Sequence, residues 1–165
     1  MEKNLSSAQI KALDFERRGV KMYLEAAKKT TNPLARRLFY SLAKEEIDHM
    51  TFIEDLKGED FNVEEEIIES RIKEIFFSLE EREIKRDSDN VEALEGAIKM
   101  EEKGKLMYME LRDNSTTEEE KTFYSKMVEE EDHHLSSLQN VHSYLTDSAD
   151  WFHSTESSTW NWMNI

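Results

Sequence analysis

Cysteine is absent from this chain of 165 residues, and glycine and proline are scarce, with four residues and one residue. Without thiols the chain can form no disulfide, no Cys-ligated zinc or iron–sulfur centre and no thiolate nucleophile. Glutamate, lysine, leucine, methionine and alanine are plentiful, and these residues favour helices over turns. The composition therefore predicts an all-α fold, and the lack of cysteine fits a reducing cytoplasm, where we expect the protein.

Long apolar runs and an excess of basic residues are missing as well. No run reaches the roughly 18 apolar residues of a membrane span, and residues 1–10 are too polar for a signal peptide. The formal net charge is −15. Nucleic acid is therefore not an expected partner, because contacts to phosphates require clustered lysine and arginine, and neither is a membrane.

Helical periodicity and capping residues predict five helices. Their approximate ranges are 7–30, 33–57, 63–86, 91–113 and 118–145. Asn32 and Pro33 separate the first two helices, as a cap and a first helical residue. Residues 146–165 carry three tryptophans, and we expect this tail to pack on the helices or on a partner subunit.

An internal repeat relates the first two helices to the last two. At a sequence offset of 85, the repeat pairs Glu16 with Glu101, Gly19 with Gly104, and Tyr23 with Tyr108. At a sequence offset of 84, it pairs Phe39 with Phe123, Glu46 with Glu130, and His49 with His133. Two copies of one helical hairpin, joined by a long crossover that contains the extra helix, predict a four-helix bundle over residues 1–145.

Acidic residues and histidines interrupt the apolar faces of these helices. The six residues are Glu16, Glu46, His49, Glu101, Glu130 and His133. A carboxylate in a core is costly unless it is paired or binds a metal, and clustered carboxylates repel one another. One glutamate from each of two helices, with Glu-x-x-His from each of the other two, is a known di-metal arrangement. We predict that these residues bind two metal ions, with iron favoured over manganese.

Some assignments stay open at the level of sequence. His134 forms its own Glu-x-x-His with Glu131 and fits the apolar heptad of the last helix, so it could replace His133 as a ligand. Tyr23 and Tyr108 lie two turns beyond the ligands of their helices and could hydrogen-bond to them. They could equally be aromatic residues of the core.

Two segments occur twice and carry a resemblance to a known family. They are Ala-x-x-x-Glu-x-x-Gly-x-x-Met-Tyr and Glu-Glu-x-Asp-His. Over residues 8–142 the chain resembles the rubrerythrin-type branch of the ferritin-like proteins. The resemblance implies a ferritin-like bundle with a non-haem di-iron centre that reacts with hydrogen peroxide or dioxygen. It implies that either Glu16 and Glu101 or Glu46 and Glu130 bridge the irons.

The sequence departs from classical rubrerythrins in two ways. It has no Cys-ligated rubredoxin domain, and Gly104 stands where those proteins carry a further glutamate. Gly104 and its repeat partner Gly19 either allow close helix packing or leave room beside the metals.

We therefore expect an oxidoreductase that reduces hydrogen peroxide or dioxygen with electrons from an external donor. The alternatives are a non-catalytic iron- or manganese-binding protein that handles iron, and a helical bundle without metal. Association as a homodimer is an open option.

Overall fold

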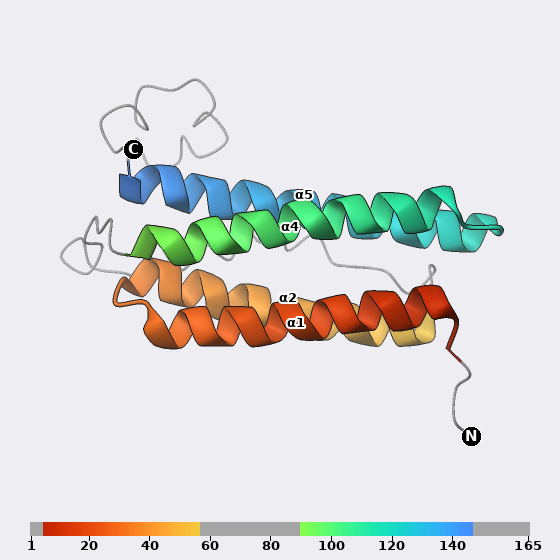
Figure 1. The fold of residues 1–165 in the computed structure, drawn as a ribbon, viewed down its shortest axis with the longest axis horizontal. Helices are drawn as coiled ribbons and strands as arrows, with labels where there is room; N and C mark the ends of the chain where they lie inside the picture. Colours follow the sequence, from red (N-terminus) through yellow and green to blue (C-terminus); the bar gives the residue numbers. More distant parts are fainter. Residues whose placement is uncertain (1–4, 57–89, 147–165) are drawn as a thin grey trace, which may run out of the picture.

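The computed structural model describes residues 5–56 and 90–146, which form four α-helices (Figure 1). The helices are α1 (Ser7–Lys29), α2 (Pro33–Asp55), α4 (Val91–Asp113) and α5 (Glu118–Thr146). Neither range contains a strand. The predicted all-α fold is therefore confirmed, with helix ends within two residues of those expected. The predicted helix at 63–86 and the tail after Thr146 lie outside the described residues.

Local hydrogen bonds explain where the first two helices begin and end. Ser6 and Gln9 form a capping box, in which each side chain accepts a hydrogen bond from the other residue's backbone N–H. Before α2, the Asn32 side chain accepts from a backbone N–H of the first turn, and Pro33 is the first helical residue. The helix ends at Leu56, which has the left-handed φ of 44°. The short Asn-Pro link therefore folds α1 and α2 into an antiparallel hairpin.

Two hairpins lie side by side along their full length (Figure 1). The most extensive contacts are within the hairpins, α1 with α2 and α4 with α5, and further contacts join α1 to α4 and α2 to α5. At one end, Thr31 and Asn90 exchange two hydrogen bonds of 3.2 Å. Nearer the other end, Lys11 bonds to Glu110 at 2.8 Å. These contacts fix the register between the hairpins.

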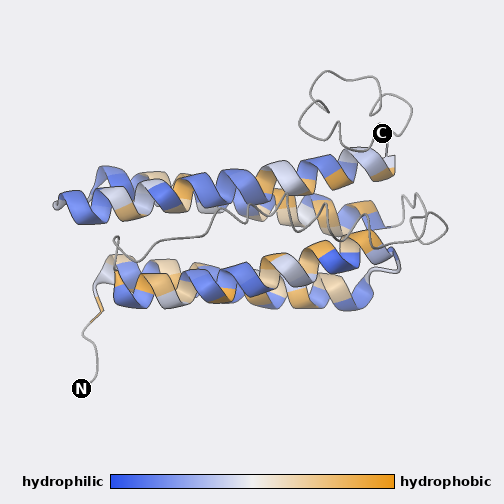
Figure 2. Cartoon of the chain, turned by 180° about the vertical axis from the view of Figure 1, so that it is seen from behind, coloured by the Kyte–Doolittle hydropathy of each residue, from blue (hydrophilic) through white to orange (hydrophobic). Residues whose placement is uncertain are grey.

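Two apolar clusters fill the bundle, one towards each end. The first takes residues from the second half of α1 and the first half of α2, including Tyr23, Leu38 and Leu42. The second includes Leu13 and Phe123. Each helix carries a hydrophobic stripe and a hydrophilic one, which Figure 2 shows as alternating orange and blue. Between the two clusters, the middle of each described helix directs polar side chains towards the other helices.

The buried face of α1 includes a polar residue near the start of the helix. Ile10, which lies one turn before the buried Leu13, is 57% exposed, and Gln9 is buried in its place. The Gln9 side chain is held there because its amide donates to the carbonyl of Ile53 at 2.8 Å. A polar side chain with a buried partner thus replaces an apolar one at the bundle end.

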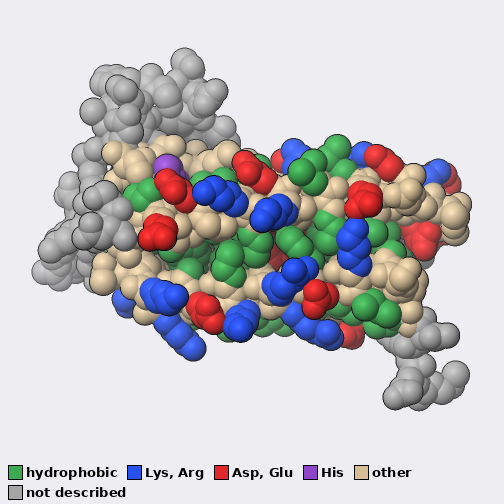
Figure 3. All heavy atoms as spheres, viewed as in Figure 1, with side chains coloured by type: hydrophobic (Ala, Val, Ile, Leu, Met, Phe, Trp, Pro, Cys, Tyr) green, Lys and Arg blue, Asp and Glu red, His purple; other side chains and the backbone are tan. Residues whose placement is uncertain are grey.

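Charged side chains of both signs cover the outer faces of the helices (Figure 3). In the same view, hydrophobic side chains follow the seam between α1 and α4. Among the described helices, none has the length and apolar character needed to cross a membrane.

Candidate metal centre

A layer of buried glutamates and histidines lies between the two apolar clusters. Its members are Glu16 on α1, Glu46 and His49 on α2, Glu101 on α4, and Glu131 and His134 on α5. None of them is more than 3% exposed. Each of the four described helices therefore contributes to one polar layer in the middle of an otherwise apolar bundle.

The last helix presents different residues from those predicted. His133 is exposed and Glu130 is half-buried, whereas Glu131 and His134 are fully buried. The expectation that His133 points inward is therefore wrong, and the open alternative, His134, occupies the core. Glu130 lies at the edge of the layer, where it still approaches the histidine His49.

The difference arises because the repeat was aligned one residue out of register between α2 and α5. Glu46 and His49 are matched in burial by Glu131 and His134, at a sequence offset of 85. The same offset relates α1 to α4, so no residue is gained or lost between the hairpins. The glutamate and histidine identities at an offset of 84 arise because α5 contains three consecutive glutamates and two consecutive histidines. A constant offset of 85 would have found the buried residues.

Glu46 lies at the centre of the layer, between the two histidines. Its Oε2 is 3.1 Å from Nδ1 of His49, and its Oε1 is 3.5 Å from Nδ1 of His134. His49 Nδ1 is also 3.6 Å from Glu16, and His134 Nδ1 is 3.6 Å from Glu101. The layer thus contains two groups of potential ligands, each with one imidazole, and Glu46 belongs to both.

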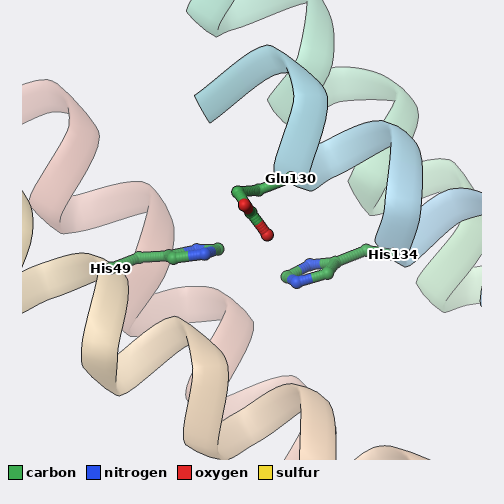
Figure 4. A group of neighbouring side chains, drawn as sticks. All are labelled: His49, Glu130 and His134. Atoms are coloured by element: carbon green, nitrogen blue, oxygen red, sulfur yellow. The ribbon is translucent and has the colours of Figure 1, made fainter. Parts of the chain in front are cut away.

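A third group lies beside these two. A carboxylate oxygen of Glu130 and one ring nitrogen from each of His49 and His134 lie within 4.8 Å of one another. Figure 4 shows the Glu130 carboxylate pointing from α5 towards both imidazoles. The two rings are nearly parallel, with centroids 5.3 Å apart.

The electrostatics of the layer follow from burial and from the proximity of like charges. Burial, and then the neighbouring Glu46, raises the pKa of Glu16 well above its usual value. Burial and the charge of Glu101 do the same to the pKa of Glu131. Burial alone would raise the pKa of Glu46, but its proximity to Glu16 and to the two histidines holds it well below its usual value.

Both histidines are strong bases in this environment. Burial alone would lower their pKa values, but the surrounding carboxylates outweigh it. Glu16 and Glu46 raise the pKa of His49 to about 10. The pKa of His134 is raised well above its usual value, first by Glu101. The protein alone therefore balances its buried carboxylates with protons, which divalent cations would displace.

Buried polar atoms that lack a hydrogen bond are the observation by which this donor set fits metal ions. Eight buried oxygen and nitrogen atoms of the layer make no hydrogen bond within the described residues; they belong to Glu16, Glu46, Glu101, Glu131 and His134. Leaving such atoms unpaired in a core costs free energy, which metal coordination would recover. Four carboxylates and two imidazoles are donors suited to iron or manganese.

The two tyrosines of the repeat do not have the same contacts. The Tyr108 hydroxyl donates a hydrogen bond to Glu16, the glutamate of the other hairpin. Burial, and then the Glu16 charge, raises the pKa of Tyr108 well above its usual value. The Tyr23 hydroxyl is buried and has no hydrogen-bond partner among the described residues. Tyr108 thus contacts a predicted ligand, whereas Tyr23 packs in the apolar cluster.

The repeated glycines make room for carboxylates. A Cβ atom on Gly19 would lie 3.5 Å from the side chain of Glu46, and one on Gly104 would lie 2.5 Å from Oε2 of Glu131. Each glycine of a first helix therefore faces the buried glutamate of the second helix in its own hairpin. This pairing supports Glu131, rather than Glu130, as the repeat partner of Glu46.

The fold and the layer define a class: four-helix bundles with a buried carboxylate–histidine site of the di-metal pattern. Comparison with protein families identifies the member, since the family model described as rubrerythrin matches residues 10–142. The chain belongs to the rubrerythrin family, as its repeated segments predicted. Comparisons with curated proteins and with solved structures give no match.

Proposed function

We propose that this protein is a non-haem di-iron oxidoreductase that reduces hydrogen peroxide or dioxygen with electrons from an external donor. The observation that carries the proposal is the position of Glu46, whose two oxygens each face the Nδ1 atom of a different histidine. One carboxylate between two equivalent donor groups is what a pair of bridged metal ions requires. Membership of the rubrerythrin family favours iron in that position.

The ligands follow from the two groups. Glu16 and His49 would bind one iron, Glu101 and His134 the other, and Glu46 would bridge them. Glu131 is the repeat partner of Glu46 and would provide the second bridge. Of the two bridging pairs left open by the sequence, this geometry supports the glutamates of the Glu-x-x-His segments, with Glu131 in place of Glu130.

Hydrogen peroxide needs two electrons and two protons to give two molecules of water, and two ferrous ions would supply those electrons by becoming ferric. The protein's own groups hold protons at the site. The Tyr108 hydroxyl donates to Glu16, and its raised pKa keeps it protonated at neutral pH. Burial of the whole layer excludes bulk water, which favours reaction with a small oxidant. The chain has no cysteine, so a separate donor must return the electrons.

The experiment compares one turnover with many. Anaerobically prepared ferrous protein is mixed with hydrogen peroxide, and the optical spectrum and the remaining peroxide are followed with and without an added reductant. We expect one equivalent of peroxide to be consumed per iron pair, and sustained consumption only with the reductant. Unaided disproportionation would contradict the peroxidase reaction. Bound iron that neither peroxide nor dioxygen oxidises would favour a non-catalytic iron-binding protein.

A further inference from the structure

The buried layer has an apolar cover where α1 meets α4. Phe15 and Met100 are repeat partners at an offset of 85, and each immediately precedes the buried glutamate of its helix. Phe15 is 9% exposed and Met100 is partly buried, whereas Glu16 and Glu101 are not exposed at all. The two apolar side chains therefore lie nearer to solvent than the carboxylates beside them.

Met100 covers one approach to the layer. It lies on α4, and its Cε methyl group is 3.4 Å from the point where a Cβ atom on Gly19 of α1 would lie. The Glu46 side chain, which faces both histidines, lies 3.5 Å from the same point. Since glycine adds no side chain here, movement of the Met100 side chain would leave a short approach to Glu46. The approach starts in the seam between α1 and α4, which hydrophobic side chains follow in Figure 3.

The corresponding position in the other half of the repeat is packed more tightly. A Cβ atom on Gly104 would lie 2.7 Å from the Phe15 ring and 2.5 Å from the Glu131 carboxylate. Both distances are shorter than an ordinary contact of a Cβ atom, so the ring and the carboxylate already fill the space beside this glycine. The guanidinium of Arg18 also lies over the Phe15 ring, 5.9 Å from its centroid.

The two covering side chains differ in mobility as well. Methionine has a flexible, unbranched side chain that adapts to irregular spaces. Side chains with exposed area change rotamer within picoseconds to nanoseconds. The Met100 methyl group can therefore move away from Gly19 and return, whereas the rigid ring of Phe15 is held between Gly104 and Arg18.

We propose that Met100 determines which oxidants reach the metal centre, by admitting small molecules through the α1–α4 seam at Gly19 and excluding larger ones. Phe15 closes the corresponding position at Gly104. The proposal rests on the function proposed above. Hydrogen peroxide and dioxygen need only the end of one side chain to move, whereas a hydroperoxide with a branched alkyl group needs the whole side chain to move.

The test compares oxidants of two sizes. Stopped-flow spectroscopy follows a single oxidation of anaerobically prepared ferrous protein by hydrogen peroxide and by tert-butyl hydroperoxide. The variants are Met100→Ala, Met100→Phe and Phe15→Met. The matched controls are Met107→Ala, Met107→Phe and Phe52→Met, the same changes at partly buried positions that pack on the second apolar cluster.

Association of azide gives a readout that does not depend on turnover. The iron is first oxidised with ferricyanide, and the optical change on azide binding is followed in the same variants. Azide is small and does not oxidise methionine. All the substitutions exchange uncharged side chains, so repulsion of the anion by the acidic chain is the same throughout. Melting temperatures of the metal-free variants detect loosening of the bundle.

We expect Met100→Ala to speed oxidation by tert-butyl hydroperoxide at least about 10-fold relative to oxidation by hydrogen peroxide, the discrimination that a few carbon atoms give in a closely packed pocket. Met100→Phe should slow both oxidants and azide. Phe15→Met should speed all three, because it gives the second position a movable cover. The controls at Met107 and Phe52 should leave the three rates unchanged.

Several results would overturn the proposal. Rates that are the same in Met100→Ala, Met100→Phe and the unchanged protein would show that oxidants do not pass this residue. Equal changes in the Met107 controls would indicate general loosening. A response in Phe15→Met without one in the Met100 variants would place the approach at Gly104.

The two probes separate this inference from the proposed function. If azide association depends on Met100 but neither peroxide nor dioxygen oxidises the iron, the approach is supported and the oxidoreductase is contradicted. If peroxide oxidises the iron at rates that no Met100 variant changes, the oxidoreductase is supported and the approach is contradicted. A chain that binds no iron would contradict both.

Discussion

The two hairpins place the same kinds of residues at a constant offset of 85, yet their central glutamates make different contacts. Glu46 of the first hairpin reaches both histidines. Glu131 of the second is equally buried but belongs to none of the groups of potential ligands. Its carboxylate instead packs so closely on Gly104 that a Cβ there would lie 2.5 Å away. The repeat has thus placed a buried glutamate at the same position of each hairpin, but only Glu46 lies among the groups of potential ligands of the metal-free protein.

The aromatic neighbours of the site differ in a related way. Tyr23 stacks on Phe39 with ring centroids 6.1 Å apart, and Tyr108 stacks on Tyr124 at 6.2 Å. The packing is repeated almost unchanged, but only Tyr108 reaches a glutamate of the layer. The comparison teaches that the repeated hairpin sets the fold and the types of side chain in the layer, while the contacts of these side chains differ between the hairpins.

The largest expected effect is a difference in bound metal between variants of the two central glutamates, Glu46 and Glu131. Glu46→Ala should remove most of the bound metal, because its oxygens serve both groups. Glu131→Ala should retain more, since its carboxylate lies outside both. Elemental analysis after anaerobic loading with Fe²⁺ measures the difference, with exposed Glu129→Ala as the control. Equal losses in the two variants would mean that the observed asymmetry is irrelevant to binding.

The next effect concerns adjacent histidines. His134→Ala should lose about one of two metals, because the buried imidazole supplies one donor to one group. His133→Ala should keep both, since His133 is exposed. The same metal analysis applies. Greater loss on replacement of His133 would restore the pairing of His49 with His133 and contradict the register of α5.

The third expected effect is similar for the two hairpins. It is the pH dependence of the stability of the metal-free protein. The pKa of His49 is raised from 6.5 to about 10 on folding, so the native state holds a proton that the unfolded state releases. Its stabilisation is complete below pH 6.5 and is lost as the pH rises towards 10. The raised pKa values of Glu16 and Glu131 act in the same direction.

Thermal unfolding between pH 6.5 and 10 in the presence of a chelator measures this slope. The melting temperature should fall across the range, and His49→Gln should flatten the dependence. Since the pKa of His134 is also raised, His134→Gln should flatten it too. A melting temperature that rises with pH would show that the histidines are not protonated in the native protein.

The smallest expected effect tests the two glycines. Gly104→Ala should destabilise the protein by about 1–3 kcal/mol, because the new Cβ would also lie 2.7 Å from the Phe15 ring. Gly19→Ala meets only ordinary contacts of 3.4 Å or more, so its better helix propensity could add up to about 1 kcal/mol. Chemical denaturation of both metal-free variants gives the two values. Equal stability changes would show that the hairpins pack their glutamates alike.

The sequence was sufficient to predict the four described helices and most of the buried layer. Caps at Asn32 and Pro33 and the clear periodicity of each helix set the boundaries. Glu16, Glu46, His49 and Glu101 were recognised because each is an isolated polar residue in an apolar stripe. A charged residue at such a position needs a partner, so the physical argument leads directly to a site.

The register of α5 could not be read in the same way. Glu130 with His133 and Glu131 with His134 are the same motif, one residue apart. One residue turns a helix by about 100°, so the choice decides which pair faces the core. Likewise, the contacts of Tyr108 with Glu16 and of Glu45 with His134 cross between hairpins. They depend on how the hairpins pack, which no pattern within one helix contains.

Metal content tests the central claim most directly. The purified protein is loaded anaerobically with Fe²⁺, freed of excess metal and analysed for iron per chain, beside a variant that combines Glu46→Ala with His134→Ala. The buried layer predicts about two iron ions per chain in the unchanged protein and almost none in the variant. Iron that fails to bind the unchanged protein, or that binds the variant equally well, would contradict a metal centre at these residues.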